Sequence, residues 1–456
     1  MATAALATIF IGLIGFYVIS NAIGRDARSR CGFVIASTNV SSLEYLTGKF
    51  AGNVVFLATF TFGFMCSAMA MVLVRGEAPL QPLVFAKQYA LVLPSSILFV
   101  SALALVFESI PFLSGRFGDV AYFFVWSALL GVVASGIEHG GSPGLLGAFD
   151  ISGMGFMFSS MSNAMHTTHM AIGSSPYDPT KGTYVFAGLT MSREWILPRL
   201  LSLLLPMPLI LFARLFFHRF DPVRVKQTSK KRSWALLARI NQLFKPLTRS
   251  SMALMAHASG SSLLRSALAD ALLTITATPV LALAFVGTSI VALSSPLKSS
   301  MPIVIVAMGI AIADVASREA RAGAMALAFA SPLLKPRFVA FKLLSSLFVL
   351  APFAIAPLLR MSGAPKMMLA FLGGTFFIAA AATFLGLVSG NAKTFIVLFL
   401  SFWYVAVNDK GATPGLDFAG FNGSATFSVI AIYAAITIAF VVAAQAVHSW
   451  RLRNAY

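Results

Sequence analysis

Long apolar runs alternate with short polar stretches along the whole chain, and the runs have the length of membrane-spanning helices. A helix needs about 20 residues to cross the hydrocarbon layer of a membrane. Long unbroken runs predict helices, because a segment in lipid must satisfy its backbone hydrogen bonds internally. The predicted spans lie at about 4–22, 51–74, 87–107, 118–137, 196–217, 272–294, 300–317, 339–359, 367–390, 394–407 and 425–447. The pattern therefore predicts an all-α polytopic membrane protein with about eleven spans.

The composition agrees with this prediction. Hydrophobic residues make up 58% of the 456 residues and charged residues only 11%, with a mean hydropathy of +0.86. A soluble protein carries roughly 25% charged residues. The composition therefore excludes a soluble enzyme or a nucleic-acid-binding protein, and we expect the lipid bilayer as a partner and no nucleic acid.

The basic residues predict the orientation. The net charge is +18, and if the segment after the first span faces the cytoplasm, 24 of the 33 Lys and Arg lie on that side. Cytoplasmic loops of membrane proteins are enriched in Lys and Arg. We therefore expect the N-terminus outside and the C-terminus in the cytoplasm, in a bacterial inner (cytoplasmic) membrane.

A polar, strongly basic segment divides the apolar pattern into two halves. We predict a first transmembrane half at 1–217 with an outer loop at 138–194, a basic cytoplasmic linker at 218–270, and a second transmembrane half at 271–456. Within the linker, residues 233–246 have helical spacing. They predict a helix on the membrane surface or an ordinary basic linker.

An internal repeat relates the two halves. The stretch 24–28 (Gly-Arg-Asp-Ala-Arg) aligns with 317–321 (Ser-Arg-Glu-Ala-Arg) at a shift of 293 residues. Without a gap, the same shift places Tyr45 on Phe338 and Lys49 on Lys342. If the two halves have the same number of spans, the two copies of the repeat are separated by six spans. An even separation makes the repeat parallel, with both copies on the same side of the membrane.

Each copy continues into an amphipathic stretch that is too polar to span and too apolar for a free loop. The apolar positions are Cys31, Phe33, Val34 and Ile35 in the first copy and Met325, Leu327 and Phe329 in the second. They predict one cytoplasmic amphipathic helix in each half, with one face toward lipid and one toward a soluble partner. A plain anchor for the next span is the alternative. Two copies at matching positions favour two docking sites for a symmetric partner.

At these residues the sequence resembles the ABC-2 type exporter permeases. Residues 36–50 (ASTNVSSLEYLTGKF) look like the segment that follows the second helix of that family. Residues 217–222 (FHRFDP) resemble the end of the first half in its fused, two-half members. Gly390-Asn391 through Phe395, Trp403-Tyr404 and 416–418 (Leu-Asp-Phe) look like the last loop of the second half. The resemblance covers the chain from about residue 20 to its end.

The chain departs from the family pattern at two points. Its first half shows one predicted span fewer than the second, so that an initial span is missing or the N-terminus lies outside. Asn39 also stands where a proline is common, whereas the second copy has Pro332.

The resemblance implies a transport subunit with two cytoplasmic amphipathic coupling helices. Separate ATP-binding subunits, expected as two copies, would dock under them and bind ATP and Mg²⁺. Nucleotide-driven closure would then switch the permease between inward- and outward-facing states. The docking residues expected on this basis are Arg25, Asp26, Arg28, Glu44, Lys49, Arg318, Glu319, Arg321, Lys335, Arg337 and Lys342.

The chain itself shows no motif for nucleotide chemistry. No G-x-x-x-x-G-K-[ST] sequence occurs, so a phosphate-binding loop of that kind is absent. We expect the chain to be no enzyme and to bind no cofactor of its own. The cargo is not specified, although the aromatic- and Met-rich composition favours a hydrophobic or amphipathic one.

The outer loop contains a run of methionines at helical spacing. Met161 and Met165 share a helical face, and His166 and His169 follow one turn apart. Such soft ligands suit copper. Methionine is also a flexible filler of apolar contacts, and we favour packing over a metal site.

Two other function classes compete with the exporter. A secondary transporter of the major-facilitator kind also has two parallel six-span halves and a basic central loop. The order of charges at 24–30 differs from the short loop motif of that class, and the stretch that follows is too long. A membrane-embedded enzyme using His166 and His169 is the third class, but no acid–base pair is predicted inside a span.

Overall fold

The computed structural model describes residues 1–76, 79–138, 145–165, 189, 191–217, 220, 262–278 and 280–454. These residues form helices and connecting turns, and this part of the chain contains no strand. The chain divides into two compact units, Met1–Lys231 and Arg232–Tyr456. The division falls inside the predicted linker, most of which (218–219 and 221–261, including the helix predicted at 233–246) lies outside the described residues.

Every predicted span coincides with helical structure. In the part of the chain that the structure describes, seven helices are long and apolar enough to cross a membrane: Ala2–Arg28, Ser42–Arg75, Pro82–Ser109, Arg193–Phe216, Leu334–Arg360, Pro365–Ser389 and Phe427–Asn454. Among the described residues an eighth candidate is the pair α13 (Leu263–Ala277) and α14 (Val280–Ser294), which are bent by 90° relative to each other. The protein is therefore a helical, polytopic membrane protein, as the hydrophobic pattern predicts.

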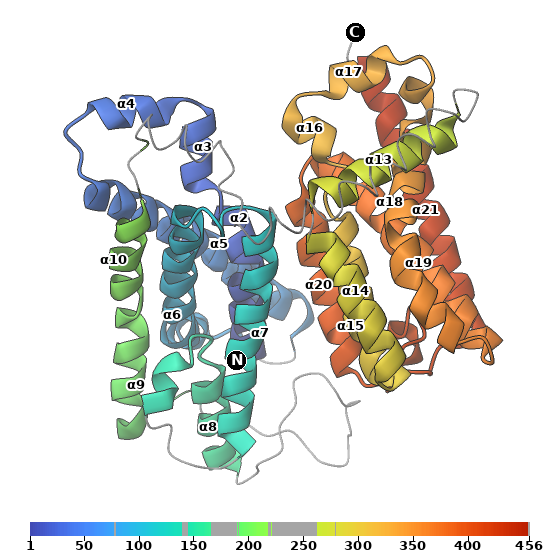
Figure 1. Cartoon of the computed structure of the whole chain (residues 1–456). Helices are drawn as coiled ribbons and strands as arrows, with labels where there is room; N and C mark the ends of the chain where they lie inside the picture. Colours follow the sequence, from blue (N-terminus) through green and yellow to red (C-terminus); the bar gives the residue numbers. More distant parts are fainter. Residues whose placement is uncertain are drawn as a thin grey trace. The chain divides into compact units, whose positions relative to one another are not determined.

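The first unit is built around α6 (Pro82–Ser109), which packs against the first span, α5 (Ser42–Arg75), α9 (Arg193–Leu204) and α10 (Pro206–Phe216). The first span consists of α1 (Ala2–Phe10), a π-helical turn η1 (Ile11–Gly15) and α2 (Phe16–Ile19). The short helices α3 (Ala22–Arg28) and α4 (Cys31–Ser37) lie at one end of this unit. α8 (Met154–Met165) lies at the other end, next to α7 (Arg116–Glu138) and the 3₁₀ turn η2 (Leu145–Phe149) (Figure 1).

The second unit is built around α18 (Leu334–Arg360). It packs against α13 (Leu263–Ala277), α14 (Val280–Ser294), α15 (Leu297–Ile312) and α19 (Pro365–Ser389). α21 (Phe427–Asn454) lies along α19, and α20 (Ala392–Asn408) precedes the turn η4 (Pro414–Leu416). The short helices α16 (Arg318–Ala322) and α17 (Met325–Ala330) lie at the end of this unit that also holds α13 (Figure 1).

Several helices extend beyond the apolar runs that predicted them. α5 begins at Ser42 rather than at residue 51, because Ser41 and Glu44 form a capping box that starts the helix in polar sequence. α13 begins at Leu263 rather than at residue 272, with the side chain of Ser262 accepting a hydrogen bond from the Arg265 amide. These extensions place charged side chains next to the short helices.

Candidate functional site

The first candidate site is the segment 21–53, which we call the first charged segment. α3 ends at Arg28, and Arg30 adopts a left-handed conformation (φ +62°) before α4 begins. A left-handed residue cannot continue a right-handed helix. The chain therefore turns here, and α5 begins a few residues later.

The second charged segment, 314–346, has the same order of elements. α16 ends at Ala322, Gly323 is left-handed (φ +66°), α17 follows, and α18 begins at Leu334. Gly323 lies 293 residues after Arg30, the shift that aligns the two sequences. The left-handed break therefore recurs at the equivalent position, and the order of the helices around it is the same.

The apolar positions of each predicted amphipathic stretch lie on one short helix, α4 or α17, and the basic stretch before it forms a separate short helix, α3 or α16. Several of these apolar side chains are exposed. Phe33 and Val34 on α4 are 48% and 66% exposed, and Leu327 on α17 is 78% exposed. No residue of α16 or α17 is buried.

In each charged segment, an ion pair joins the first short helix to the long helix that follows. The Lys49 ammonium lies 2.8 Å from the Asp26 carboxylate, and the Tyr45 hydroxyl donates to the same carboxylate at 2.7 Å. In the second segment the Lys342 ammonium lies 2.5 Å from the Glu319 carboxylate. Both pairs join equivalent positions of the repeat, so α3 is fixed to the start of α5 and α16 to the start of α18.

The two ion pairs differ in burial because a further helix covers the second. Asp270 of α13 contacts the Lys342 ammonium at 3.2 Å and also pairs with Arg318. Ser345 donates a hydrogen bond to Asp270, and Thr274 accepts one from Arg318 at 2.9 Å. The Lys342 side chain is fully buried, whereas the Lys49 side chain remains 29% exposed.

The remaining predicted docking residues take different places. Arg28 and Arg337 are exposed, the latter at a kink in the first turn of α18. Arg321 pairs with Asp314, and Lys335 is half-buried. The Glu44 carboxylate accepts a hydrogen bond from the Ser41 amide at 2.7 Å, so it caps α5. Arg28 and Arg337, like the exposed Arg25, are therefore available to meet a partner.

Sequence reasoning missed Glu108, at the end of α6. Its carboxylate accepts hydrogen bonds from four consecutive backbone amides, those of residues 21–24, at the start of α3. A negative charge at the N-terminus of a helix also stabilises the helix dipole. In the sequence, Glu108 is recognisable only as a single acidic residue directly after the apolar run 87–107. That run does not indicate that its carboxylate binds the amides of residues 21–24.

Replacing Glu108 with glutamine is expected to loosen α3. The side-chain amide keeps one acceptor oxygen but replaces the other with an NH2 donor that faces backbone N–H donors, which costs about 1–3 kcal/mol for the groups left unsatisfied. Trypsin should then cleave after Arg25 and Arg28 about tenfold faster or more. Glu194→Gln, at an exposed position of α9, is the matched control. Equal cleavage rates in the two variants would contradict this role of Glu108.

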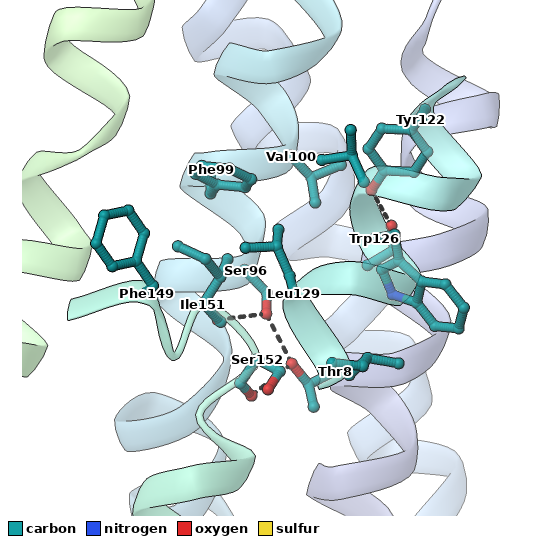
Figure 2. A pocket seen from close by; sticks show the side chains of 13 residues that line it. Thr8, Ser96, Phe99, Val100, Tyr122, Trp126, Leu129, Phe149, Ile151 and Ser152 are labelled. Atoms are coloured by element: carbon teal, nitrogen blue, oxygen red, sulfur yellow. Dashed lines mark hydrogen bonds between the residues drawn. The ribbon is translucent and has the colours of Figure 1, made fainter. Parts of the chain in front are cut away.

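A second polar cluster lies inside the first unit, away from α3. The Thr8 hydroxyl of α1 donates to the Ser152 carbonyl at 2.8 Å, and the Ser96 hydroxyl of α6 donates to the Ile151 carbonyl at 2.9 Å. Figure 2 shows these side chains beside a cavity bordered by Tyr122 and Trp126. The cavity measures about 30 Å³. That volume accommodates a water molecule but not a transported substrate.

Asp150 and Arg199 hold the turn beside this cavity. The Arg199 guanidinium donates to the carbonyls of Asp150, Leu91 and Val92, at 2.7–3.0 Å. The Asp150 carboxylate accepts from the Phe156 amide at 2.9 Å. Burial raises the pKa of the Asp150 carboxyl, and the nearby Arg199 charge opposes that shift. These hydrogen bonds give Asp150 and Arg199 a structural role, because both side chains hold backbone groups of the turn in place.

The methionine run predicted in the outer loop forms α8, and its inner face packs into the unit. Met157 is buried against Phe156 and Trp195. Met161 lies on the same helix, and α8 ends at Met165. His166 and His169, the other candidate metal ligands, lie outside the described residues. Within the described part of the chain, no group of three or more His, Cys, Asp or Glu side chains is placed to hold a metal ion.

Comparisons with known proteins add no relative. No protein-family model, curated protein or solved structure matches the chain.

Proposed function

We propose that this chain is the transmembrane permease subunit of an ABC exporter. It would move a hydrophobic or amphipathic substrate by alternating access, driven by separate ATP-binding subunits. Its fold would comprise about eleven spans in two parallel halves. The first and second charged segments would be its two coupling regions, on the cytoplasmic side of a bacterial inner membrane, with the N-terminus outside and the C-terminus inside.

The observation that carries this proposal is the likeness of the two charged segments. Each has two short helices separated by a left-handed residue, followed by a long apolar helix. Each is closed by an ion pair between equivalent residues, Asp26 with Lys49 and Glu319 with Lys342. Two similar charged segments of this kind would suit two copies of one partner subunit.

The surfaces have the chemistry of a docking site. Exposed apolar side chains on α4 and α17 lie close in sequence to exposed Arg28 and Arg337. Buried apolar contacts with a charged rim are the usual composition of a protein interface. Because ion pairs fix α3 to α5 and α16 to α18, movement of a docked subunit would be transmitted to these long helices.

Purification of the C-terminally tagged chain from native membranes in mild detergent tests this function. We expect a soluble ATP-binding subunit to co-purify, together with ATP hydrolysis that the isolated chain lacks. Recovery of the chain without such a subunit, under conditions that preserve a known ABC complex, would contradict the proposal. Such a result would favour a secondary transporter of the major-facilitator kind.

A further inference from the structure

A groove runs along the first half of α5, beside α2 and α3. Its volume is about 680 Å³. Val18, Ile19 and Phe56 supply apolar walls, and Arg25 and Lys49 place two positive charges at one end. Glu44 lies at the same end, where its carboxylate caps α5. The helix behind the groove is poorly covered, since only 11% of the apolar stretch of α5 is buried within its unit, against 56% for α18.

Two glycines form part of the groove wall on α5. Gly48 and Gly52 are four residues apart and therefore lie on one face of the helix. A Cβ atom built on either glycine has no atom within 4 Å. Small residues at this spacing allow the backbones of two membrane helices to approach closely. The spacing therefore favours a helix as the occupant of the groove.

A buried polar side chain beside the glycines lacks a partner. Asn53 lines the groove and is only 7% exposed, and its side-chain amide nitrogen makes no hydrogen bond to the described residues. An unsatisfied buried donor costs about 1–3 kcal/mol. An acceptor brought into the groove would remove that cost, so Asn53 is an independent sign of a missing ligand.

The second unit shows what occupies the equivalent place. At the shift of 293 residues, Arg25, Lys49 and Gly52 correspond to Arg318, Lys342 and Ser345. All three of those second-unit side chains contact Asp270 of α13, which packs along α18. In the first unit no described helix packs on α5 in this way. In the first unit Lys49 is already paired with Asp26. Arg25, at the place of Arg318, has no ion pair among the described residues that corresponds to the pair of Arg318 with Asp270.

We propose that the groove binds a membrane-spanning helix of a second polypeptide. That helix would cross α5 at Gly48 and Gly52 and present an Asp or Glu carboxylate to Arg25, beside the pair of Lys49 with Asp26. It would also offer an acceptor to the Asn53 amide. This inference rests on the internal comparison and is independent of whether ATP-binding subunits dock on the charged segments.

Photo-cross-linking in native membranes tests the proposal. The photoreactive analogue p-benzoylphenylalanine replaces either Phe56, which lines the groove and is 50% exposed, or Phe62, which is 61% exposed and does not line it. Cross-linking from position 56, and not from position 62, to a membrane-spanning polypeptide with an acidic residue near one end is the expected result. Cross-links only to lipid, only to peptides of this chain, or equally from both positions would overturn the proposal.

A substitution in the groove wall shows whether the cross-linked polypeptide occupies the groove. Gly52→Leu fills space that is open in the chain itself, so we expect its fold to persist and the yield to fall about tenfold. Ala58→Leu, at an exposed position of α5 outside the groove, is the matched control and should leave the yield unchanged. Replacing the partner's carboxylate with its amide should also lower the yield about tenfold. A yield insensitive to Gly52→Leu or to loss of the carboxylate would contradict the assignment.

Discussion

Lys342→Met is expected to destabilise the protein far more than Lys49→Met, although the two lysines occupy equivalent positions. The Lys342 ammonium is fully buried and contacts both Glu319 and Asp270. Removing it leaves two carboxylates that are only 17% and 12% exposed. Breaking a buried ion pair from one side costs about 3–5 kcal/mol, which should lower the melting temperature by roughly 10 °C.

The Lys49 variant is the matched control. The Lys49 side chain is 29% exposed, against 0% for Lys342, and Tyr45 still donates to Asp26 after the change. Exposed pairs contribute about 0–1 kcal/mol. Thermal unfolding in detergent, followed by tryptophan fluorescence, compares the two variants. Equal shifts in melting temperature would contradict the burial difference.

A double variant separates lost charge pairing from lost packing. Lys342→Met combined with Glu319→Gln leaves one negative charge fewer in the buried site. Since replacing both partners of a buried pair costs less than removing one, part of the stability lost in the single variant should return. Failure of the second substitution to recover any stability would show that the ammonium acts through packing alone.

Charge reversal at Arg28 and Arg337 is expected to disrupt the proposed coupling. Both residues are exposed, and we find no ion pair for either within the described part of the chain. Arg318 and Arg321 are unsuitable targets, because they pair with Asp270 and Asp314 and their reversal would disturb the fold. Loss of a buried charged contact at an interface costs about 2–5 kcal/mol. The affinity of the ATP-binding subunit should therefore fall at least about tenfold.

Exposed basic residues at the other ends of the same helical regions provide controls. Arg75→Glu lies at the C-terminal end of α5, and Lys366→Glu lies at the start of α19, just after α18. They change the net charge as much as the test variants do, but they lie far along the chain from the charged segments. Titration of the purified permease with the ATP-binding subunit measures the affinities. Similar losses in controls and test variants would indicate a general charge effect.

The helices could be predicted from the sequence because apolar runs of span length leave few alternatives. Their ends were less predictable, since local capping by Ser41 and Glu44 starts α5 in polar sequence. The break between the basic stretch and the amphipathic helix of each half also escaped prediction. It depends on backbone conformation at Arg30 and Gly323, where glycine gives a signal and arginine gives none.

The candidate site was predictable only in part. The repeat located Asp26, Lys49, Glu319 and Lys342 at equivalent positions, and the structure joins them in pairs. The repeat could not reveal that Glu108 of α6 contacts the first charged segment or that Asp270 of α13 contacts the second. Those contacts depend on tertiary packing, which the spacing of one segment does not encode.

The number of ATP-binding subunits carried by one chain tests the central claim most directly. Native mass spectrometry of the complex, released from mild detergent, measures that number. The account predicts two copies of an ATP-binding subunit for each chain, one for each charged segment. A chain that carries no nucleotide-binding subunit, beside a known ABC complex that stays intact under the same conditions, would contradict it.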